Sequence, residues 1–593
     1  MAKPKAKRTQ VSSGSSKSKS QSQSLPSQTK SQSETKLHSR TQQQQQLQQL
    51  QSSNTLYKNQ STQKKKSAFV SLFKASPLND FLMPFRKAYN QWVTRYIIII
   101  FAVIIRCAVG LGSYSGENTP PMFGDFEAQR HWLEITVNLP ISEWYFYDLQ
   151  YWGLDYPPLT AFHSFFLGKI GNLIDKSWFL LDSSRGFETS DLKSYMRITA
   201  LISELVIYIP AVVWYCKWMG RYYNNALPVD QTIIAAAILF QPHLIIIDHG
   251  HFQYNSVMLG FTLLSIVNLL YDNYCLASVF FICSIMFKQM ALYYAPVIFC
   301  YLLSLCTWPF PSNIKLLRLI SIGISVVLTV LIILLPFILQ GGINQVAQII
   351  HRVFPFARGL FEDKVANFWC ATNLIIKYKN ILSPNQLQKL SLLLTILSIT
   401  PCCTLIYLYP RKNLLSWSFA ACSWSFFLFS FQVHEKSVLL PLLPTTLLLC
   451  EVDPDVISMV CWICNISLFS MWPLLKRDGL VLQYFVLGIL SNWLMGNLSW
   501  IRKFASKLGM PISARDKAQT VLPHNWFWII IIIGSYAAAL LLHIVEFVRP
   551  PPENLPDLWV IGNVLISFGC FILFWLWNNY KLFKLCHTKI KLV

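Results

Sequence analysis

The sequence predicts an all-α integral membrane protein, and its composition, its apolar segments and the placement of its charges all indicate this class. Of its 593 residues, 53% are hydrophobic and 13% are charged, and the mean hydropathy is +0.40. Soluble domains carry about 25% charged residues. Because backbone amides inside a bilayer must be paired within the protein, we expect a multi-span helical bundle.

The N-terminal 92 residues differ in composition from the rest of the chain. Residues 1–96 contain 17 of the 50 Lys and Arg residues but only 2 of the 28 acidic residues, which accounts for +15 of the net charge of +22. The segment is rich in Ser and Gln and poor in aromatic residues, so it cannot bury enough apolar surface to offset its ordering entropy. We predict that residues 1–92 form a disordered, solvated cytosolic tail. Contact with anionic lipid is the alternative, and we expect no nucleic-acid partner.

Apolar segments fill most of the remaining chain, and a segment of about 20 residues is long enough to cross a bilayer. We predict about 14 transmembrane helices within one domain at residues 93–580, of which 274–287 and 437–450 are short. The segments lie at residues 93–112, 197–218, 231–247, 254–271, 274–287, 289–306, 316–339, 388–408, 414–433, 437–450, 455–473, 479–498, 525–545 and 557–580.

The basic residues indicate the orientation of these segments. Lys and Arg precede the first segment and follow even-numbered ones, which places both termini in the cytosol by the positive-inside rule. No apolar run precedes Ile97, so we expect the first segment to anchor the chain uncleaved. Residues 581–593 form a second cytosolic tail ending in "KIKLV". This ending is similar to a K-x-K-x-x retrieval signal of the endoplasmic reticulum, and a plain basic flank of the last helix explains it equally well.

Two long loops, at about 113–197 and 340–388, are expected on the luminal side, where loops of this length usually carry function. In the first loop, apolar residues recur at helical spacing from Phe126 onward, which predicts an amphipathic helix at the membrane surface. Asp125 stands at the N-terminal end of this helix. It is placed to cap the helix, to act as a general base, or to do both.

Asp155 follows Asp125 by 30 residues in the same loop, within "WGLDYPPLTAFHS". Two carboxylates flank the sugar in glycoside chemistry. A turn or cap role for Asp155 is equally compatible with the sequence.

Another polar group, "IIIDHGHFQYNS", separates two apolar segments at a luminal end. Ionisable residues at bilayer depth cost roughly 2.5–3.5 kcal/mol each, so these side chains need partners. His251, Gln253 and Asn255 are candidate binding residues. His249 and His251 form an H-x-H pattern, which is weak evidence for a metal, and we predict no metal and no other cofactor.

Basic side chains gather on the same predicted face, against the positive-inside trend. They are Lys288, Arg352, Arg358, Lys364, His434 and Lys436. Point charges and bidentate donors hold phosphate, so the group predicts a site for an anionic lipid head group. Snorkelling at a helix end is the alternative for each residue taken singly. The sequence has neither a phosphate-binding loop nor a dinucleotide fingerprint, so we expect donor and acceptor both to arrive through the lipid.

Five segments resemble, in this order, the endoplasmic-reticulum glucosyltransferases that use dolichyl phosphate glucose: "GDFEAQRHW", "WGLDYPPLTAFHS", "GHFQYN", "RGLFEDKVANFWC" and "HEKSVLLPLLP". The resemblance covers about residues 93–580. It implies a GT-C fold with a luminal active site, and transfer of glucose from dolichyl phosphate glucose to the lipid-linked oligosaccharide for protein N-glycosylation. The first two segments are more similar to the members that add the first glucose, in alpha-1,3 linkage, to dolichyl pyrophosphate Man9GlcNAc2.

The resemblance also implies roles for single residues. Asp125, the Asp of the G-D-F-E motif, is the implied general base, which removes the proton of the acceptor hydroxyl in one inverting displacement. No metal is implied. The residues assigned to substrate binding are Glu127, Arg130, His131, Asp155, His251, Gln253, Asn255, Lys288, Arg352, Arg358, His434 and Lys436.

Two alternatives stay open on the sequence. One is a sister enzyme that adds the second glucose or a mannose. The other is a transporter of lipid-linked oligosaccharide, for which inverted repeats and helices broken at the bilayer midplane are expected. The chain shows no internal repeat.

Overall fold

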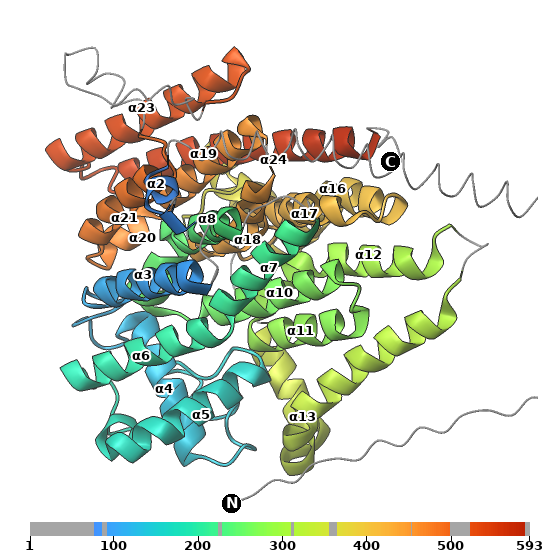
Figure 1. Cartoon of the computed structure of the whole chain (residues 1–593). Coiled ribbons are helices and arrows are strands. Elements are labelled where there is room, and N and C mark those ends of the chain that lie inside the picture. The colour runs from blue at the N-terminus through green and yellow to red at the C-terminus, as the bar shows by residue number, and fades with distance from the viewer. Residues whose placement is uncertain are drawn as a thin grey trace, which may run out of the picture. The chain divides into compact units, whose positions relative to one another are not determined.

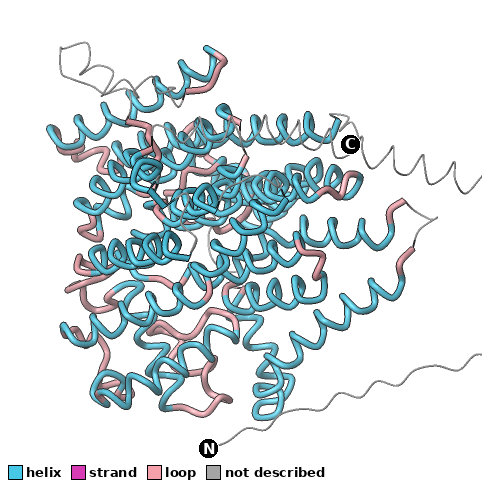
Figure 2. The backbone as a smooth tube through the Cα atoms, viewed as in Figure 1, coloured by secondary structure: helices cyan, strands magenta, loops and turns pink. Residues whose placement is uncertain are grey.

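All regular structure in the described part of the chain is helical (Figure 1 and Figure 2). The computed structural model describes residues 76–82, 84–85, 92–222, 228–309, 314–354, 364–451, 453–498 and 522–587. Most of the predicted tail, the candidate residue Arg358 and the ending "KIKLV" lie outside these residues.

Each predicted apolar segment coincides with helical structure. The short elements are η2 (Lys176–Phe179), the π-helical turn η3 (Ile247–Phe252), η4 (Gln289–Tyr294) and η6 (Glu435–Val438). The main helices are α3 (Trp92–Gly110), α4 (Gly124–Asn138), α5 (Pro158–Ile174), α6 (Ser190–Val206), α7 (Tyr208–Tyr222), α8 (Pro228–Leu239), α9 (Pro242–Ile246), α10 (Asn255–Leu270), α11 (Tyr274–Phe287), α12 (Ala295–Thr307), α13 (Leu316–Val353), α14 (Phe368–Thr372), α15 (Tyr378–Ile381), α16 (Pro384–Leu408), α17 (Leu415–Phe429), α18 (Leu439–Leu447), α19 (Pro454–Ser470), α20 (Trp472–Arg477), α21 (Val481–Leu494), α23 (Trp526–Val548) and α24 (Leu558–His587).

Seven helices among the described residues are long and apolar enough to cross a membrane. An eighth span is reached if Gln231–Leu239 and Pro242–Phe252, which are bent by 46°, count as one. Helices α10, α11, α19 and α21 are apolar but shorter, at 10–17 residues. The protein is therefore a multi-pass membrane protein, and the total of 14 spans stays a prediction.

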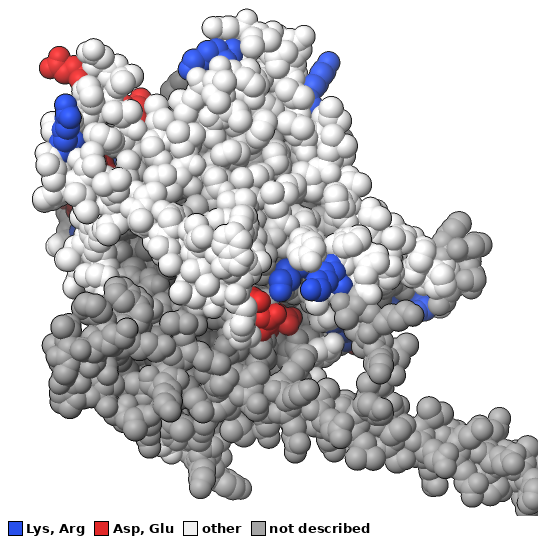
Figure 3. Space-filling model, turned by 90° about the horizontal axis from the view of Figure 1, so that it is seen from above, with Lys and Arg blue, Asp and Glu red and all other residues white. Residues whose placement is uncertain are grey.

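Two of the apolar helices, α13 and α23, turn most of their side chains outward. Only 11% of the most apolar window is buried in each of α13 and α23. The described part of the face seen in Figure 3 carries few Lys, Arg, Asp or Glu side chains, and many large apolar side chains of α13 and α23 are exposed. An apolar surface of this extent is far larger than soluble monomers expose, and it suits contact with lipid chains.

The interior is built by pairs of packed helices. Helix α10 packs against α7 and α11, and α17 packs against α16, α18 and α24 (Figure 1). Aromatic rings join the last pair: Trp424 of α17 and Phe571 of α24 have ring centroids 4.9 Å apart. Both side chains are fully buried, so this contact anchors the C-terminal helix on the bundle.

A buried ionic cluster ties α3, α6 and η3 together. The guanidinium of Arg106 donates to both carboxylate oxygens of Glu204, at 2.7 Å each, and Nε2 of His249 lies 2.6 Å from the same carboxylate. Bidentate pairing is the geometry that best compensates the cost of burying both charges. The cluster thereby fixes η3, which carries candidate site residues, to the first helix of the bundle.

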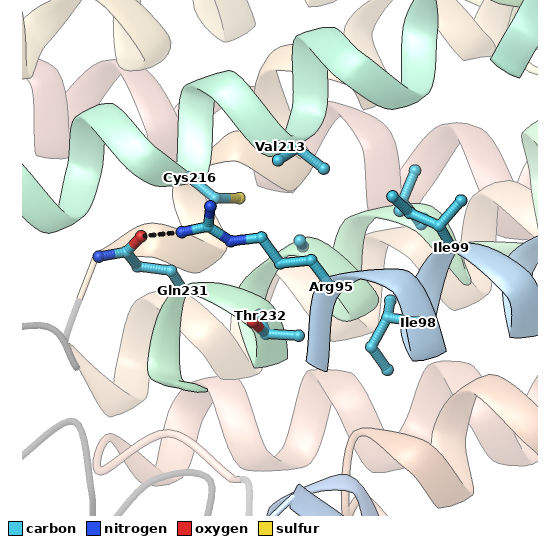
Figure 4. Close-up of a pocket in the computed structure, with 9 residues that line it drawn as sticks. Arg95, Ile98, Ile99, Val213, Cys216, Gln231 and Thr232 are labelled. Atoms are coloured by element: carbon cyan, nitrogen blue, oxygen red, sulfur yellow. Dashed lines mark hydrogen bonds between the residues drawn. The ribbon is translucent and has the colours of Figure 1, made fainter. Parts of the chain in front are cut away.

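A smaller polar contact joins α3 to α8 (Figure 4). Arg95 donates to the side-chain oxygen of Gln231 at 3.2 Å, beside Thr232 and the thiol-bearing residue Cys216. The space between them is about 10 Å³, room for roughly one water. This contact therefore serves helix packing.

Part of the predicted tail is ordered. Residues Pro77–Leu82 form helix α2, in which Leu78 and Leu82 are buried, and the hydroxyl of Ser76 donates to the carbonyl of Leu494 at 2.5 Å. The prediction of disorder up to residue 92 is thus wrong for this helix, because its two leucines find apolar partners on the bundle.

Helix α4 confirms the helix predicted in the first long loop but corrects its surroundings. Residues Phe126–Thr136 are all buried, so α4 is enclosed by protein and does not lie on a membrane surface with a wet polar face. Its start also differs from the prediction. The cap position is Phe123, no side chain caps the helix, and Asp125 lies in the first turn.

The second long loop contains more helix than predicted. Helix α13 continues to Val353 through a break at Gly342, where φ is 64° and ψ is −160°. Glycine adopts this conformation without a Cβ penalty. The break redirects the last turns of α13 and brings Arg352 to the first loop, where it donates to the carbonyl of Gly153 at 2.9 Å.

Candidate active site

A cavity of about 1470 Å³ opens among the ends of these helices. It exceeds the roughly 300–1,000 Å³ of most small-molecule sites, so it has room for a large substrate. Its walls come from the loop before α4, from α4 itself, from η3, and from the ends of α11, α13, α18 and α20. Nine predicted site residues line it: Asp125, Asp155, His251, Gln253, Asn255, Lys288, Arg352, His434 and Lys436.

Close backbone packing places Asp125 at the cavity wall. Gly124, the first residue of α4, has a φ of 71°, and a Cβ built there would lie 2.8 Å from the Cα of Gly116. Only glycine fits this turn. The backbone N–H of Asp125 also faces the hydroxyl of Ser115 at 3.4 Å, so the start of the helix is held against the preceding loop.

Three side-chain nitrogens converge on one carboxylate oxygen of Asp125. Its Oδ2 lies 2.9 Å from Nε2 of His251 and 2.7 Å from the amide nitrogen of Gln253, and it accepts from the ammonium of Lys436. The other oxygen, Oδ1, has no hydrogen-bond partner among the described residues. Asp125 can therefore accept one further proton donor from a molecule in the cavity.

The surroundings of Asp125 keep it ionised. Burial alone would raise the pKa of this carboxyl, but the charge of Lys436 and the hydrogen bond from His251 outweigh burial, and the pKa lies well below its ordinary value. Asp125 is thus a carboxylate whose basicity is reduced by Lys436.

The π-helical turn η3 presents His251 to Asp125. Arg197 of α6 donates to the carbonyls of Gly250 at 2.7 Å and Ser113 at 3.0 Å, and the N–H of Ser115 donates to the carbonyl of His251 at 3.0 Å. Single π turns recur at functional sites. Here the clamped turn holds the imidazole between two carboxylates, because Nδ1 of His251 lies 2.5 Å from Oδ2 of Asp478.

Asp478 is a cavity residue that the sequence reasoning missed. It follows α20, at the junction between the predicted segments 455–473 and 479–498. This junction falls on the predicted luminal side, so the presence of an acidic residue there could have identified Asp478 as a candidate. None of the five motifs contains Asp478.

Lys288 forms the second cationic centre of the cavity. Its ammonium donates to the side-chain oxygens of Asn255 at 2.7 Å and Gln253 at 3.4 Å, and it lies 4.7 Å from the ring centre of Tyr156. Burial and the like charge of Lys436 lower the pKa of Lys288 to about 8, against the pull of nearby carboxylates. Gln253 therefore bridges Lys288 and Asp125.

Asp155 and Arg352 meet at the rim of the cavity. Arg352 donates to the carbonyls of Gly153 at 2.9 Å and Leu154 at 3.2 Å, directly before Asp155. Both residues line the cavity, and their contact with substrate stays a prediction. In this structure the guanidinium of Arg352 positions the loop that carries Asp155.

The structure does not bring Glu127, Arg130 and His131 to the cavity. Arg130 donates to Glu127 at 2.6 Å and to Glu134 at 2.7 Å, and its other nitrogen donates to the carbonyl of Trp178 at 3.0 Å. These contacts lie on the face of α4 turned away from Asp125. The predicted substrate contacts of the three residues are therefore corrected to packing of α4 against the rest of the first long loop.

The same cluster lowers the pKa of the Glu134 carboxyl. Burial would raise the pKa of Glu134, but the hydrogen bond from His131 and the charge of Arg130 outweigh it and lower this pKa to about 2. Residues Gln129 and Trp132, on the other face of α4, do line the cavity.

Metal-ligating side chains gather elsewhere. Within the described residues, the group of three or more candidate ligands is Cys402, Cys403 and Cys422, on α16 and α17. The thiols of Cys402 and Cys422 donate to backbone carbonyls at 3.1 and 3.3 Å, and none of the three lines the cavity. The absence of a metal from the mechanism stays a prediction.

The fold and the site define an integral-membrane enzyme, with a helical bundle around a polar cavity centred on a carboxylate. Residues 102–577 match the ALG6, ALG8 glycosyltransferase family, and the chain belongs to this family.

Individual relatives agree with this family. The chain is 54% identical over 521 residues to the dolichyl pyrophosphate Man9GlcNAc2 alpha-1,3-glucosyltransferase of Saccharomyces cerevisiae, covering 86% of this chain and 95% of that protein. Proteins of the same name match at 40% over 504 residues in Gallus gallus and at 38% over 505 residues in Mus musculus. Each of these two matches covers 83% of this chain and 96% of the relative.

Proposed function

We propose that this protein transfers the first glucose from dolichyl phosphate glucose to dolichyl pyrophosphate Man9GlcNAc2, in alpha-1,3 linkage, at the luminal face of the endoplasmic reticulum membrane. The acceptor and the linkage are those in the names of relatives that align over nearly their whole length. The observation that carries the chemistry is the carboxylate of Asp125 in a cavity large enough for sugars, with one oxygen, Oδ1, that has no hydrogen-bond partner among the described residues.

The reaction is one in-line displacement. Asp125 takes the proton of the acceptor hydroxyl, the hydroxyl oxygen bonds to the anomeric carbon, and the bond from that carbon to the phosphate oxygen breaks. A positioned base of this kind contributes about 10²–10⁴-fold. The phosphate leaves as an anion, so it needs positive charge more than a proton.

Lys436 and Lys288 are the proposed phosphate ligands, with His434 beside them on the cavity wall. Lys436 contacts Asp125 in the structure, and its flexible side chain can exchange this carboxylate for a phosphate. Moving the ammonium away removes the charge that lowers the pKa of Asp125, so donor binding makes Asp125 a stronger base.

The proposed topology has 14 spans, cytosolic termini and a luminal cavity. Its support is that cavity residues from five separate junctions, Asp125, His251, Lys288, Lys436 and Asp478, all fall on the side predicted as luminal. An alternation with one span missing would place some of them on opposite faces.

Purified protein in lipid nanodiscs, given dolichyl phosphate glucose, tests the proposal with two acceptors. We expect transfer to Man9GlcNAc2 lipid and little transfer to the acceptor that already carries one glucose. The reverse preference would identify a second-glucose enzyme. Movement of lipid-linked oligosaccharide across liposomes without glucosyl transfer would identify a transporter.

A further inference from the structure

Asp478 and Asp125 bracket His251 in a continuous line. The Nδ1 of His251 lies 2.5 Å from Oδ2 of Asp478, and its Nε2 lies 2.9 Å from Oδ2 of Asp125. The imidazole and Asp478 are both buried, and the Asp125 side chain retains 24% exposure. The line therefore runs from the protein interior to the cavity surface.

The side chain of Asp478 serves His251 alone among the described residues. The backbone of Asp478 is held separately, because its N–H donates to the carbonyl of Leu474 at 3.1 Å and its carbonyl accepts from the hydroxyl of Ser113 at 2.5 Å. Position 478 is thus fixed without the carboxylate, and the carboxylate has no packing task of its own.

The contact between Asp125 and His251 depends on a proton. The lone pairs of Oδ2 and Nε2 repel each other at 2.9 Å unless a hydrogen lies between them. Lys436, 3.2 Å from Nε2 and in contact with Asp125, supplies positive charge there. Once Lys436 turns to a phosphate, the pair lacks this charge and attracts a proton.

We propose that Asp478 is a positioning residue of the proposed reaction, which holds the proton of His251 on Nδ1 so that Asp125 and Nε2 together accept the proton of the acceptor hydroxyl. The inference rests on the proposed function and deepens it. It makes His251 the second proton acceptor and assigns the negative charge behind it to Asp478.

The step balances in protons and electrons. The acceptor O–H bond breaks as the oxygen–anomeric carbon bond forms, and the electrons of the broken carbon–oxygen bond leave with the phosphate. The proton passes through Asp125 to Nε2 of His251, which becomes an imidazolium between two carboxylates. A carboxylate behind an imidazole fixes its tautomer and stabilises its charged form. Water returns the site to its starting state by removing this proton.

The test compares Asp478→Asn with Asp478→Glu in the full-length protein. An amide still accepts a hydrogen bond from Nδ1 but carries no charge. We expect kcat of Asp478→Asn to fall roughly 10²-fold, within the ~10²–10⁴ that a general base supplies, with both KM values unchanged. The acidic limb of the kcat–pH profile should move to lower pH, because the charge that favours the imidazolium is gone. Asp478→Glu should retain the wild-type limb.

Among the described residues, the charged side chains in contact with the imidazole of His251 are Asp125, Lys436 and Asp478. A shift of the acidic limb with the first two intact therefore reports on Asp478. Asp272→Asn is the matched control, since Asp272 pairs with Lys412 outside the cavity, and its kinetics should equal wild type. In the His251→Gln background, Asp478→Asn should add no further loss.

Three outcomes overturn the proposal: wild-type kcat in Asp478→Asn, a loss of kcat with an unmoved acidic limb, or full additivity with His251→Gln. The proposal would also be overturned if Asp478→Asn had a lower melting temperature and regained the wild-type kcat when lipid stabilised it. Asp478 would then have a structural role. Absence of glucosyl transfer by the wild-type protein would instead refute the proposed function, so the two failures are distinguishable.

Discussion

Substituting Asn for Asp125 separates the chemistry of this carboxylate from its contacts. The amide is nearly the same size and keeps one oxygen for His251 and Gln253, but it cannot take a proton. Because Asp125 is the proposed general base, we expect kcat for glucosyl transfer to fall while the protein stays folded.

The structure sets the magnitudes. Loss of a general base costs about 10²–10⁴-fold in kcat, which is about 2.7–5.4 kcal/mol of activation free energy. The stability effect is smaller. Hydrogen bonds to a charged oxygen contribute about 1.5–3 kcal/mol and neutral ones about 0.5–1.5 kcal/mol, so the contacts with His251, Gln253 and Lys436 weaken without being lost.

The donor KM gives the sharper readout. Lys436 contacts Asp125 in the structure and is also a proposed ligand of the donor phosphate, and the Asn variant weakens its hold on residue 125. The KM for dolichyl phosphate glucose should therefore stay equal or fall while kcat collapses. The assay is initial-rate transfer to Man9GlcNAc2 lipid with each substrate varied, beside a thermal melt. A kcat within tenfold of wild type would refute the reasoning, and Asp272→Asn again serves as the unaffected control.

Three further predictions concern the rest of the site. Lys436→Gln should raise the donor KM about tenfold or more. It should also move the acidic limb of the kcat–pH profile to higher pH, because the pKa of Asp125 rises when the ammonium is lost. An unmoved limb would contradict the pairing of Lys436 with Asp125. Arg130→Met leaves the carboxylates of Glu127 and Glu134 buried without their cation, so it should lower the free energy of unfolding by about 3–5 kcal/mol. The measurement is a lower melting temperature. A stable variant with a high donor KM would instead indicate that Arg130 binds substrate. EDTA should leave the transfer rate intact, and inhibition that a divalent ion reverses would reinstate a metal.

The convergence of distant residues on the cavity was predictable from alternation. Asp125, His251, Lys288 and Lys436 stand at segment ends that an even count places on one face, and the cost of unpaired charge at bilayer depth requires them to meet. The structure brings them into one network. Their partners within it, such as Gln253 bridging Lys288 and Asp125, depend on side-chain geometry that spacing does not encode.

In α4, helical periodicity predicts which polar residues share a face of the helix. Glu127, Arg130 and Glu134 are spaced by three and four, so they share one helix face and pair along it. Asp125 and Gln129 share the other face. Helical spacing therefore distinguishes the Glu127–Arg130–Glu134 cluster from the residues that line the cavity. The resemblance of the whole motif, in contrast, implied a substrate contact for each of its polar residues. Because Arg130 pairs with both Glu127 and Glu134, this charged face can be buried, which is why the expected surface helix is enclosed.

The pairing of Arg106 with Glu204 has a consequence for how the chain enters the membrane. Arg106 lies within the first apolar helix and Glu204 within the next candidate span, with the whole first long loop between them. Until α6 arrives, α3 carries an uncompensated cation near its C-terminal end. Such a charge costs roughly 2.5–3.5 kcal/mol at the centre of a span and less toward its end. During synthesis, α3 and α6 therefore become stable in the bilayer only as a pair. A nascent chain released after α3 alone would hold its first anchor weakly, so the first long loop, which carries Asp125, is complete before the bundle is committed to the lipid.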